Sequence, residues 1–256
     1  MRASRTLAKL RAGKTVRICG LGHFVPSYVR HAAHYGFDCI WLDLEHRTMA
    51  DREVQAMLAF CHQFDIDCMV RSPTREKVQL YRYLEDGAAG LMIPHVTTED
   101  DAKELVQSTK FPPLGNRGID GAGLDSDFYL QGGPGFTEQA NAETFLVVQI
   151  ESPEAVGNAE KIAAVEGVDG LFIGPADLSL RLPHAKPEMS LEEATERVAA
   201  AASKHGKAWG RPVGLDALKT FHQQGARLLA HGGEFLAIKD MLENAASGFD
   251  EMIGEE

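Results

Sequence analysis

Residues 145–180 read FLVVQIESPEAVGNAEKIAAVEGVDGLFIGPADLSL and decide the fold. The pattern predicts a strand, a helix and a second strand, with one carboxylate at the end of each strand. Glu151 closes the apolar run 145–150, and Asp177 follows the run 170–175. In parallel α/β folds, ligands bind at the carboxyl ends of the strands. Two carboxylates on neighbouring strands suit a hard divalent cation, so this unit predicts a metal site.

The same alternation extends in both directions along the chain. Apolar strand-like runs fall at 16–20, 37–44, 68–72, 90–96, 145–150, 170–175, 207–213 and 226–231, and amphipathic helices follow them. Further helices are predicted at 1–13 and 234–246. Eight such units in about 240 residues predict an α/β fold, a (β/α)₈ TIM barrel with one domain spanning 1–256. An open doubly wound sheet is the alternative, but neither CGLGH nor HGGE has the glycine spacing of a dinucleotide site.

The segment 111–141 interrupts this alternation of strands and helices. It is rich in glycine and proline and contains the acidic residues Asp125 and Asp127. A structureless stretch of this length in a compact domain is usually a functional or interface loop. The alternative is a disordered surface insertion.

The composition restricts the class of partner. The net charge of −11 argues against a nucleic-acid or acidic-membrane partner, and no apolar run is long enough to span a bilayer. The basic start MRASRTLAKLRAGK lacks the apolar core of a secretory signal. The cysteines show no CxxC spacing, which favours a reduced, cytoplasmic compartment; they are Cys19, Cys39, Cys61 and Cys68.

Strand alternation sorts the polar side chains of the run 145–151. Its even positions are all aliphatic and are expected to pack on the helices. Gln149 and Glu151 should therefore face the barrel axis.

The same reasoning applies to two earlier strands. Asp43 and Glu45 alternate with aliphatic residues, and Arg71 ends the third strand on its inward face. These side chains are expected to meet at one mouth of the barrel, with His46 and Asp177 on adjoining loops. Local salt bridges are the alternative explanation for each charge.

Six motifs in order resemble one enzyme family, and they span most of residues 14–245. They are WLDLEH (41–46), VRSP (70–73), GLMIPHV (90–96), FPPLGNRG (111–118), VVQIE (147–151) and VEGVDGLFIGPADLS (165–179). The chain resembles the metal-dependent 2-oxo acid aldolases, of the 4-hydroxy-2-oxoheptanedioate or 2-dehydro-3-deoxy-sugar-acid type, in the pyruvate-kinase-like superfamily.

The resemblance implies a carbon–carbon lyase in a TIM barrel. It implies a divalent metal (Mg, Mn or Co) and reversible cleavage of a 4-hydroxy-2-oxo acid to pyruvate and an aldehyde. It also implies a homohexamer, a trimer of dimers, in which the C-terminal helix packs on a neighbouring subunit.

Lysine placement independently argues against an imine mechanism. Retro-aldol cleavage needs a base and an electron sink, either a lysine Schiff base or a metal. No lysine lies at the carboxyl end of a predicted strand, and Lys207 lies at the opposite end of its strand. Lys77, Lys103, Lys161, Lys204, Lys219 and Lys239 fall on predicted helices.

The resemblance also implies roles for individual residues. Glu151 and Asp177 correspond to the metal ligands. Backbone N–H groups of the turn Gly174–Asp177, those of Ala176 and Asp177, would hold the substrate carboxylate.

Four further residues receive roles from the same resemblance. Arg71 would stabilise the enolate oxygen, and Gln149 would contact the oxo acid. His46 would act as the general base, with Asp43 as its orienting partner.

Several positions depart from the family pattern. Leu44 stands where glycine is usual, His23 where tryptophan is common, and His95 where a small or aliphatic residue is usual. The segments IDGAGLDSDFYLQ (119–131) and HGGEFLAI (231–238) also differ. The aldehyde, the stereochemistry and any part played by His23 and His95 therefore stay open.

Two alternative functions are weighed against the aldolase. A related lyase acting on a CoA thioester would need a basic groove, which the acidic composition does not favour. A non-catalytic metabolite-binding barrel would keep Glu151 and Asp177 but would need neither His46 nor Arg71, and both are present.

Overall fold

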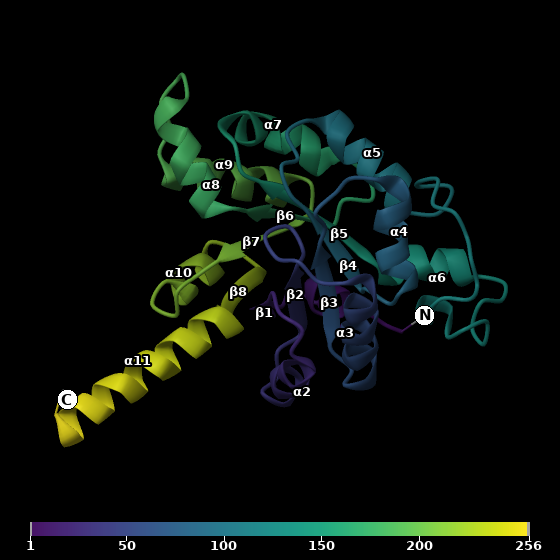
Figure 1. The fold of residues 1–256 in the computed structure, drawn as a ribbon. Coiled ribbons are helices and arrows are strands. Elements are labelled where there is room, and N and C mark those ends of the chain that lie inside the picture. The colour runs from purple at the N-terminus through teal and green to yellow at the C-terminus, as the bar shows by residue number, and fades with distance from the viewer. Residues whose placement is uncertain (1, 255–256) are drawn as a thin grey trace.

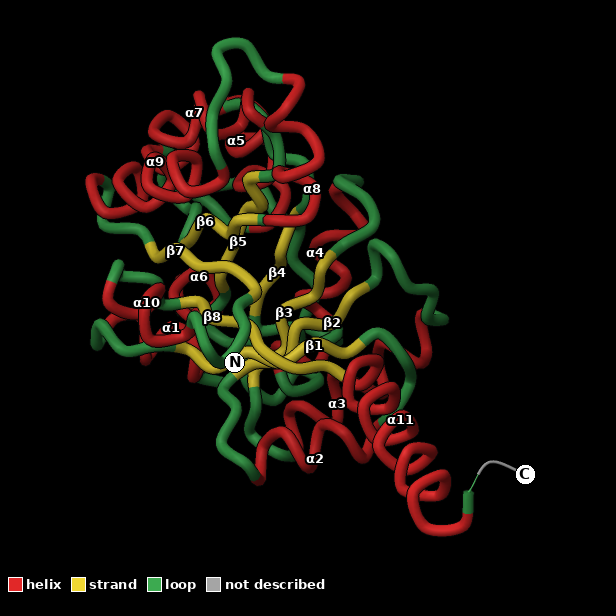
Figure 2. Tube along the Cα trace, turned by 90° about the vertical axis from the view of Figure 1, so that its left-hand side faces the viewer, coloured by secondary structure: helices red, strands yellow, loops and turns green. Residues whose placement is uncertain are grey.

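The computed structural model describes residues 2–254, which form a closed barrel of eight parallel strands (Figures 1 and 2). Each strand pairs with the next in sequence, and β8 pairs with β1. The strands are β1 (Val16–Leu21), β2 (Cys39–Asp43), β3 (Asp67–Arg71), β4 (Gly90–Ile93), β5 (Phe145–Ile150), β6 (Gly170–Ile173), β7 (Ala208–Pro212) and β8 (Leu228–Gly233). The predicted (β/α)₈ barrel is confirmed, and the doubly wound alternative is wrong.

Helices surround the barrel. They are α1 (Arg5–Arg11), α2 (Pro26–His34), α3 (Asp51–Gln63), α4 (Lys77–Glu85), α5 (Glu99–Thr109), α6 (Phe136–Glu143), α7 (Pro153–Ala164), α8 (Pro175–Arg181), α9 (Leu191–Lys204), α10 (Leu218–Gln223) and α11 (Glu234–Ile253), with short 3₁₀ turns η1 (Leu124–Ser126) and η2 (Leu182–His184). The start of α9 is capped by the residues that the sequence predicts. Ser190 Oγ accepts the backbone N–H of Glu193, and the Glu193 side chain accepts the backbone N–H of Ser190, which together form a capping box.

Strand alternation separates two apolar layers. Leu146, Val148 and Ile150 of β5 belong to the layer between barrel and helices. Val147 belongs to a second cluster inside the barrel, together with Met69 and Phe172. The predicted facing of β5 is therefore confirmed, and it directs the next inward residues of this strand to the barrel mouth.

The segment 111–141 is ordered, so the prediction of a structureless stretch is wrong. It contains η1 and the start of α6, and a buried ion pair joins Arg117 to Asp125 at 2.7 Å. Phe111 packs on Phe136 with ring centroids 6.0 Å apart. The segment leads into the N-terminal end of β5, away from the carboxyl ends of the strands. Its part in function stays a prediction.

The last helix, α11, extends away from the barrel (Figure 1). Five of its exposed apolar side chains fall on one stripe, at spacings of three, four or seven residues: Phe235, Ile238, Leu242, Phe249 and Met252. This is the period of a coiled-coil seam. Among the described residues, no helix is long and apolar enough to cross a membrane.

Candidate active site

An arginine lies at the carboxyl end of the barrel. Arg71, the last residue of β3, donates from Nε to Asp43 Oδ1 at 2.9 Å, and its Nη2 lies 2.7 Å from Asp43 Oδ2. Its Nη1 lies 2.9 Å from Glu45 Oε2. The guanidinium also stacks on Trp41, 4.7 Å from the ring centroid. Arg71 is therefore fixed by two carboxylates and one aromatic face.

The same arginine controls the charge of Asp43. Burial alone would raise the pKa of this carboxyl, but the hydrogen bond and positive charge of Arg71 outweigh it. Backbone N–H groups of Glu45 and His46, 3.1 and 3.3 Å from Oδ1, act in the same direction. The pKa of Asp43 is lowered from its ordinary value, so the group is an anion at neutral pH.

Glu151 follows β5 and is 3% exposed. Gln149 Nε2 donates to its Oε1 at 2.9 Å, and the backbone N–H of His95 donates to its Oε2 at 3.1 Å. Burial raises the pKa of Glu151, and the charges of Glu45 and Asp177 raise it further, against the lowering effect of His95. The site therefore concentrates negative charge that a bound cation would relieve.

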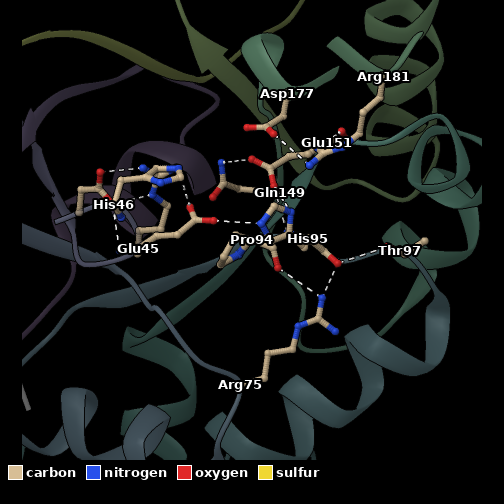
Figure 3. Close-up of polar contacts among 12 residues, drawn as sticks. Glu45, His46, Arg75, Pro94, His95, Thr97, Gln149, Glu151, Asp177 and Arg181 are labelled. Carbon is tan, nitrogen blue, oxygen red and sulfur yellow. Dashed lines mark hydrogen bonds and ion pairs between the residues drawn. The ribbon is translucent and has the colours of Figure 1, made fainter. Parts of the chain in front are cut away.

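His95 joins two of these acids. Its Nδ1 lies 3.1 Å from Glu151 Oε2 and its Nε2 lies 3.1 Å from Glu45 Oε1 (Figure 3). The residue has a φ of 57°, a left-handed conformation that is uncommon outside glycine. Arg75 donates to the carbonyl oxygens of His95 and Pro94, which fixes this turn after β4.

Asp177 enters the site from the first turn of α8. Its Oδ1 lies 3.0 Å from Arg181 Nη2, and Arg181 Nη1 donates to the carbonyl oxygen of Glu151 at 2.8 Å (Figure 3). Gly174 precedes the helix, and a Cβ there would meet Glu151 Oε1 at 2.5 Å. The glycine thus permits the close approach of α8 to Glu151.

The turn before α8 supplies backbone donors. Gly174 is the N-cap, no side chain caps the helix, and Pro175 occupies the first position. The N–H groups of Ala176 and Asp177 have no acceptor within the helix, as is general for the first turn.

His46 lies at the rim of the site with its side chain 56% exposed. Its Nε2 is 3.6 Å from Glu45 Oε2, whereas Asp43 contacts only its backbone N–H. The acid next to the imidazole is therefore Glu45, and Asp43 pairs with Arg71.

The donor set fits a hard divalent cation held mainly by oxygen. Gln149 Oε1 is buried with no hydrogen-bond partner among the described residues, and Glu151 follows the same strand. Within residues 2–254, no group of three or more His, Cys, Asp or Glu side chains is arranged to hold a metal. Mg²⁺ is commonly bound by one or two carboxylates with water and substrate oxygens, and Glu151 and Asp177 are the carboxylates that would hold it here.

The structure brings most of the predicted site residues to one mouth, and it adds others. Sequence reasoning left His95 open and missed Arg75 and Arg181. Arg181 had a signal, because it lies four residues after Asp177 on the same helix. The six lysines predicted on helices do lie there: Lys77, Lys103, Lys161, Lys204, Lys219 and Lys239.

Comparisons with known proteins identify relatives of this chain. A sequence profile described as "HpcH/HpaI aldolase/citrate lyase" matches residues 21–238. A pyruvate aldolase of Rhizobium etli is 35% identical over 90% of this chain and 88% of its own length. A hydroxypyruvate/pyruvate aldolase of Deinococcus radiodurans is 35% identical over 85% of this chain and 77% of its own.

A solved structure supports the same relationship. The HpcH/HpaI aldolase from Desulfitobacterium hafniense superposes with a TM-score of 0.88 and 31% identity, covering 97% of this chain and 98% of that one. These relationships confirm the prediction of a carbon–carbon lyase of the aldolase type. The chain belongs to the HpcH/HpaI aldolase/citrate lyase family.

Proposed function

We propose that this protein is a class II aldolase that reversibly cleaves a 4-hydroxy-2-oxo acid to pyruvate and an aldehyde. A divalent cation (Mg, Mn or Co) would be held by Glu151 and Asp177. The observation that carries the proposal is the state of Glu151: it is 3% exposed, and its pKa is raised by burial and by the acids around it. Such crowding of carboxylates is costly without a cation.

When bound, the cation would act as a Lewis acid toward the 2-oxo group. The protein's own groups perform the remaining work. The N–H groups of Ala176 and Asp177 bind the substrate carboxylate, and Gln149 donates to or accepts from the oxo acid at the base of the site. The guanidinium of Arg71, fixed by Asp43 and Glu45, supports the enolate oxygen.

The proton transfers involve the rim of the site. His46 accepts the proton of the 4-hydroxyl, directly or through a water. The C3–C4 bond then breaks, its electron pair stays with the pyruvate half as the enolate, and the aldehyde leaves. Proton return to C3 completes pyruvate. Glu45 is the acid beside this imidazole, with its Oε2 3.6 Å from His46 Nε2.

One experiment tests this function directly. Exchange of the pyruvate methyl protons into deuterated water is followed by NMR with added Mn²⁺, with and without a chelator. Exchange that depends on the metal, together with cleavage of a 4-hydroxy-2-oxo acid, is the expected result. Binding of Mn²⁺ with no exchange at any pH near neutrality would refute the aldolase and favour a non-catalytic metabolite-binding barrel.

The assembly is proposed to be a homo-oligomer, a hexamer built as a trimer of dimers. The support is α11, whose exposed apolar stripe would be covered by a second copy of the chain. The protein is further proposed to be cytoplasmic, since all four cysteines are unpaired and buried.

A further inference from the structure

Arg181, the last residue of α8, contacts both of the residues proposed to hold the cation. Its Nη2 lies 3.0 Å from Asp177 Oδ1, and its Nη1 donates to the backbone carbonyl oxygen of Glu151 at 2.8 Å (Figure 3). One guanidinium therefore bridges the end of β5 and the first turn of α8. Because its donors form a planar fork of fixed shape, Arg181 fixes the carboxylate of Asp177 relative to the backbone of Glu151.

The ion pair leaves one oxygen of Asp177 free. Oδ1 is engaged by Arg181, whereas Oδ2 makes no hydrogen bond or ion pair with the described part of the chain. A cation that took both oxygens would have to share Oδ1 with the positive charge of Arg181, which repels it, or displace the arginine. The geometry thus favours a cation that needs only one oxygen from Asp177.

The value of this contact lies in orientation rather than in stability. The side chains of Arg181 and Asp177 are 38% and 35% exposed. Ion pairs that are this accessible to solvent contribute little to the free energy of unfolding. An arginine that also binds the backbone of the neighbouring acid is therefore best explained by its effect on the position of Asp177.

Glu151 is restricted in a similar way. Gln149 donates to its Oε1, and the backbone N–H of His95 donates to its Oε2. A Cβ at Gly174 would meet Oε1 at 2.5 Å, so the start of α8 closes this side of the carboxylate. Neither acid is free to turn and enclose a larger cation with both of its oxygens.

We propose that Arg181 is a positioning residue that limits Asp177 to one oxygen toward the cation and thereby shifts the preference of the site from Ca²⁺ toward Mg²⁺. Mg²⁺ requires an octahedral shell with oxygens at about 2.0–2.1 Å. Ca²⁺ accepts about six to eight oxygens at about 2.3–2.6 Å and often binds a carboxylate through both oxygens. The inference rests on the metal site of the proposed function and names the residue that selects among cations.

The test measures cation binding rather than activity. Free Mn²⁺ is followed by electron paramagnetic resonance while Mg²⁺ or Ca²⁺ competes for the site, which gives the dissociation constant of each competitor. Arg181→Met should lower the ratio of the Ca²⁺ constant to the Mg²⁺ constant about tenfold, as is typical when a group that orients a metal ligand is lost. Because both competitors carry two charges, the lost charge of the arginine affects both constants alike and cancels in the ratio.

Arg181→Lys tests the planar fork separately from the charge. An ammonium group keeps the positive charge, but it cannot present two parallel donors to Asp177 and Glu151. The ratio in this variant should fall between those of the wild type and Arg181→Met. Circular dichroism verifies folding, and Arg181→Lys alone decides the question if the methionine variant does not fold.

Lys103→Met is the matched control. Lys103 forms an ion pair with Glu99 at the same spacing of four residues, at 2.6 Å, and the two side chains are 55% and 41% exposed on α5. The loss of this pair should leave the ratio of the two dissociation constants unchanged.

The results separate this inference from the proposed function. If the wild type does not bind Mn²⁺, the metal site of the proposed aldolase fails. If it binds Mn²⁺ and the ratio is the same in Arg181→Met, or in Arg181→Lys where only that variant folds, the role of Arg181 is overturned while the aldolase proposal stands. An equal fall of the ratio in Lys103→Met would also overturn it, because the effect would then be common to surface ion pairs.

Discussion

Nδ1 of His95 lies 3.1 Å from Oε2 of Glu151, an oxygen that also accepts the backbone N–H of His95. The ring and the backbone N–H of one residue thus contact one carboxylate oxygen, and Gln149 donates to the other. Groups that orient a metal-binding carboxylate typically change metal affinity or activity about 10- to 100-fold when removed. We expect His95→Ala to weaken Mn²⁺ binding within this range, as measured by calorimetric titration.

The matched control for this substitution is His31→Ala. His31 is exposed on α2, far from the carboxyl ends of the strands, and its loss should leave Mn²⁺ affinity unchanged. Equal affinities of His95→Ala and the wild type would show that the imidazole does not position Glu151.

Glu151→Gln should abolish metal-dependent exchange of pyruvate protons while the fold persists. The amide keeps the shape of the side chain but loses the charge that a divalent cation needs. Because burial raises the pKa of Glu151, loss of its charge should not lower the thermal midpoint. NMR exchange and circular dichroism measure the two effects. Glu154→Gln, exposed on α7, is the control; wild-type exchange in Glu151→Gln would refute the metal assignment.

Gly174→Ala tests the close approach of α8 to the acid. The added Cβ would meet Glu151 Oε1 at 2.5 Å and Cγ at 2.8 Å, so the carboxylate must move. A misplacement of about 1 Å costs on the order of 100-fold in rate, and kcat/KM should fall by about this factor.

Gly157→Ala provides the comparison for that variant. Gly157 lies within α7, where a Cβ has nothing within 4 Å. Alanine there should stabilise the protein by about 0.5–1 kcal/mol and leave kcat/KM unchanged. Similar kinetics for the two alanine variants would contradict the proposed role of Gly174.

The facing of Asp43, Gln149 and Glu151 could be predicted from the sequence. Side chains alternate between the two faces of β2 and β5, and this alternation can be read from neighbouring residues alone. Closure of the barrel then brings the three side chains to one mouth. The contacts of His95 were not predictable in this way. They depend on a left-handed turn after β4 that Arg75 fixes from another loop, and this is a property of the assembled barrel.

Two other features depend on contacts between distant residues that the sequence alone does not predict. The glycine and proline content of the segment with η1 and α6 predicts a structureless stretch, whereas the buried pair of Arg117 and Asp125 stabilises it across the loop. The family pattern pairs His46 with Asp43, but Arg71 engages both oxygens of Asp43, and Glu45 lies beside the imidazole.

The lowered pKa of Asp43 makes its contribution to stability depend on pH. A carboxyl whose pKa falls on folding stabilises the protein above its ordinary pKa of 3.8, and this stabilisation is lost as the pH falls through the lowered value. Asp43→Asn should therefore destabilise the protein by about 1 kcal/mol near neutrality, since Glu45 still pairs with Arg71, and the difference from the wild type should shrink below pH 3.8. Urea unfolding across this range measures it.

The control for the pH series is Asp100→Asn, whose side chain is 90% exposed. It should differ little from the wild type at any pH. A stability difference for Asp43→Asn that stays constant down to the most acidic condition would show that its cause is packing rather than the charge on Asp43.

The apolar stripe of α11 predicts how the assembly is held together. Leu242 and Phe249 are 58% and 67% exposed in the single chain, one heptad apart on the same face. A charge at Leu242 would be buried without a partner if a second copy covers this face, so Leu242→Glu should reduce the mass seen in sedimentation velocity. Asn244→Glu adds the same charge on the opposite face and should not. An unchanged mass would exclude the stripe as the interface.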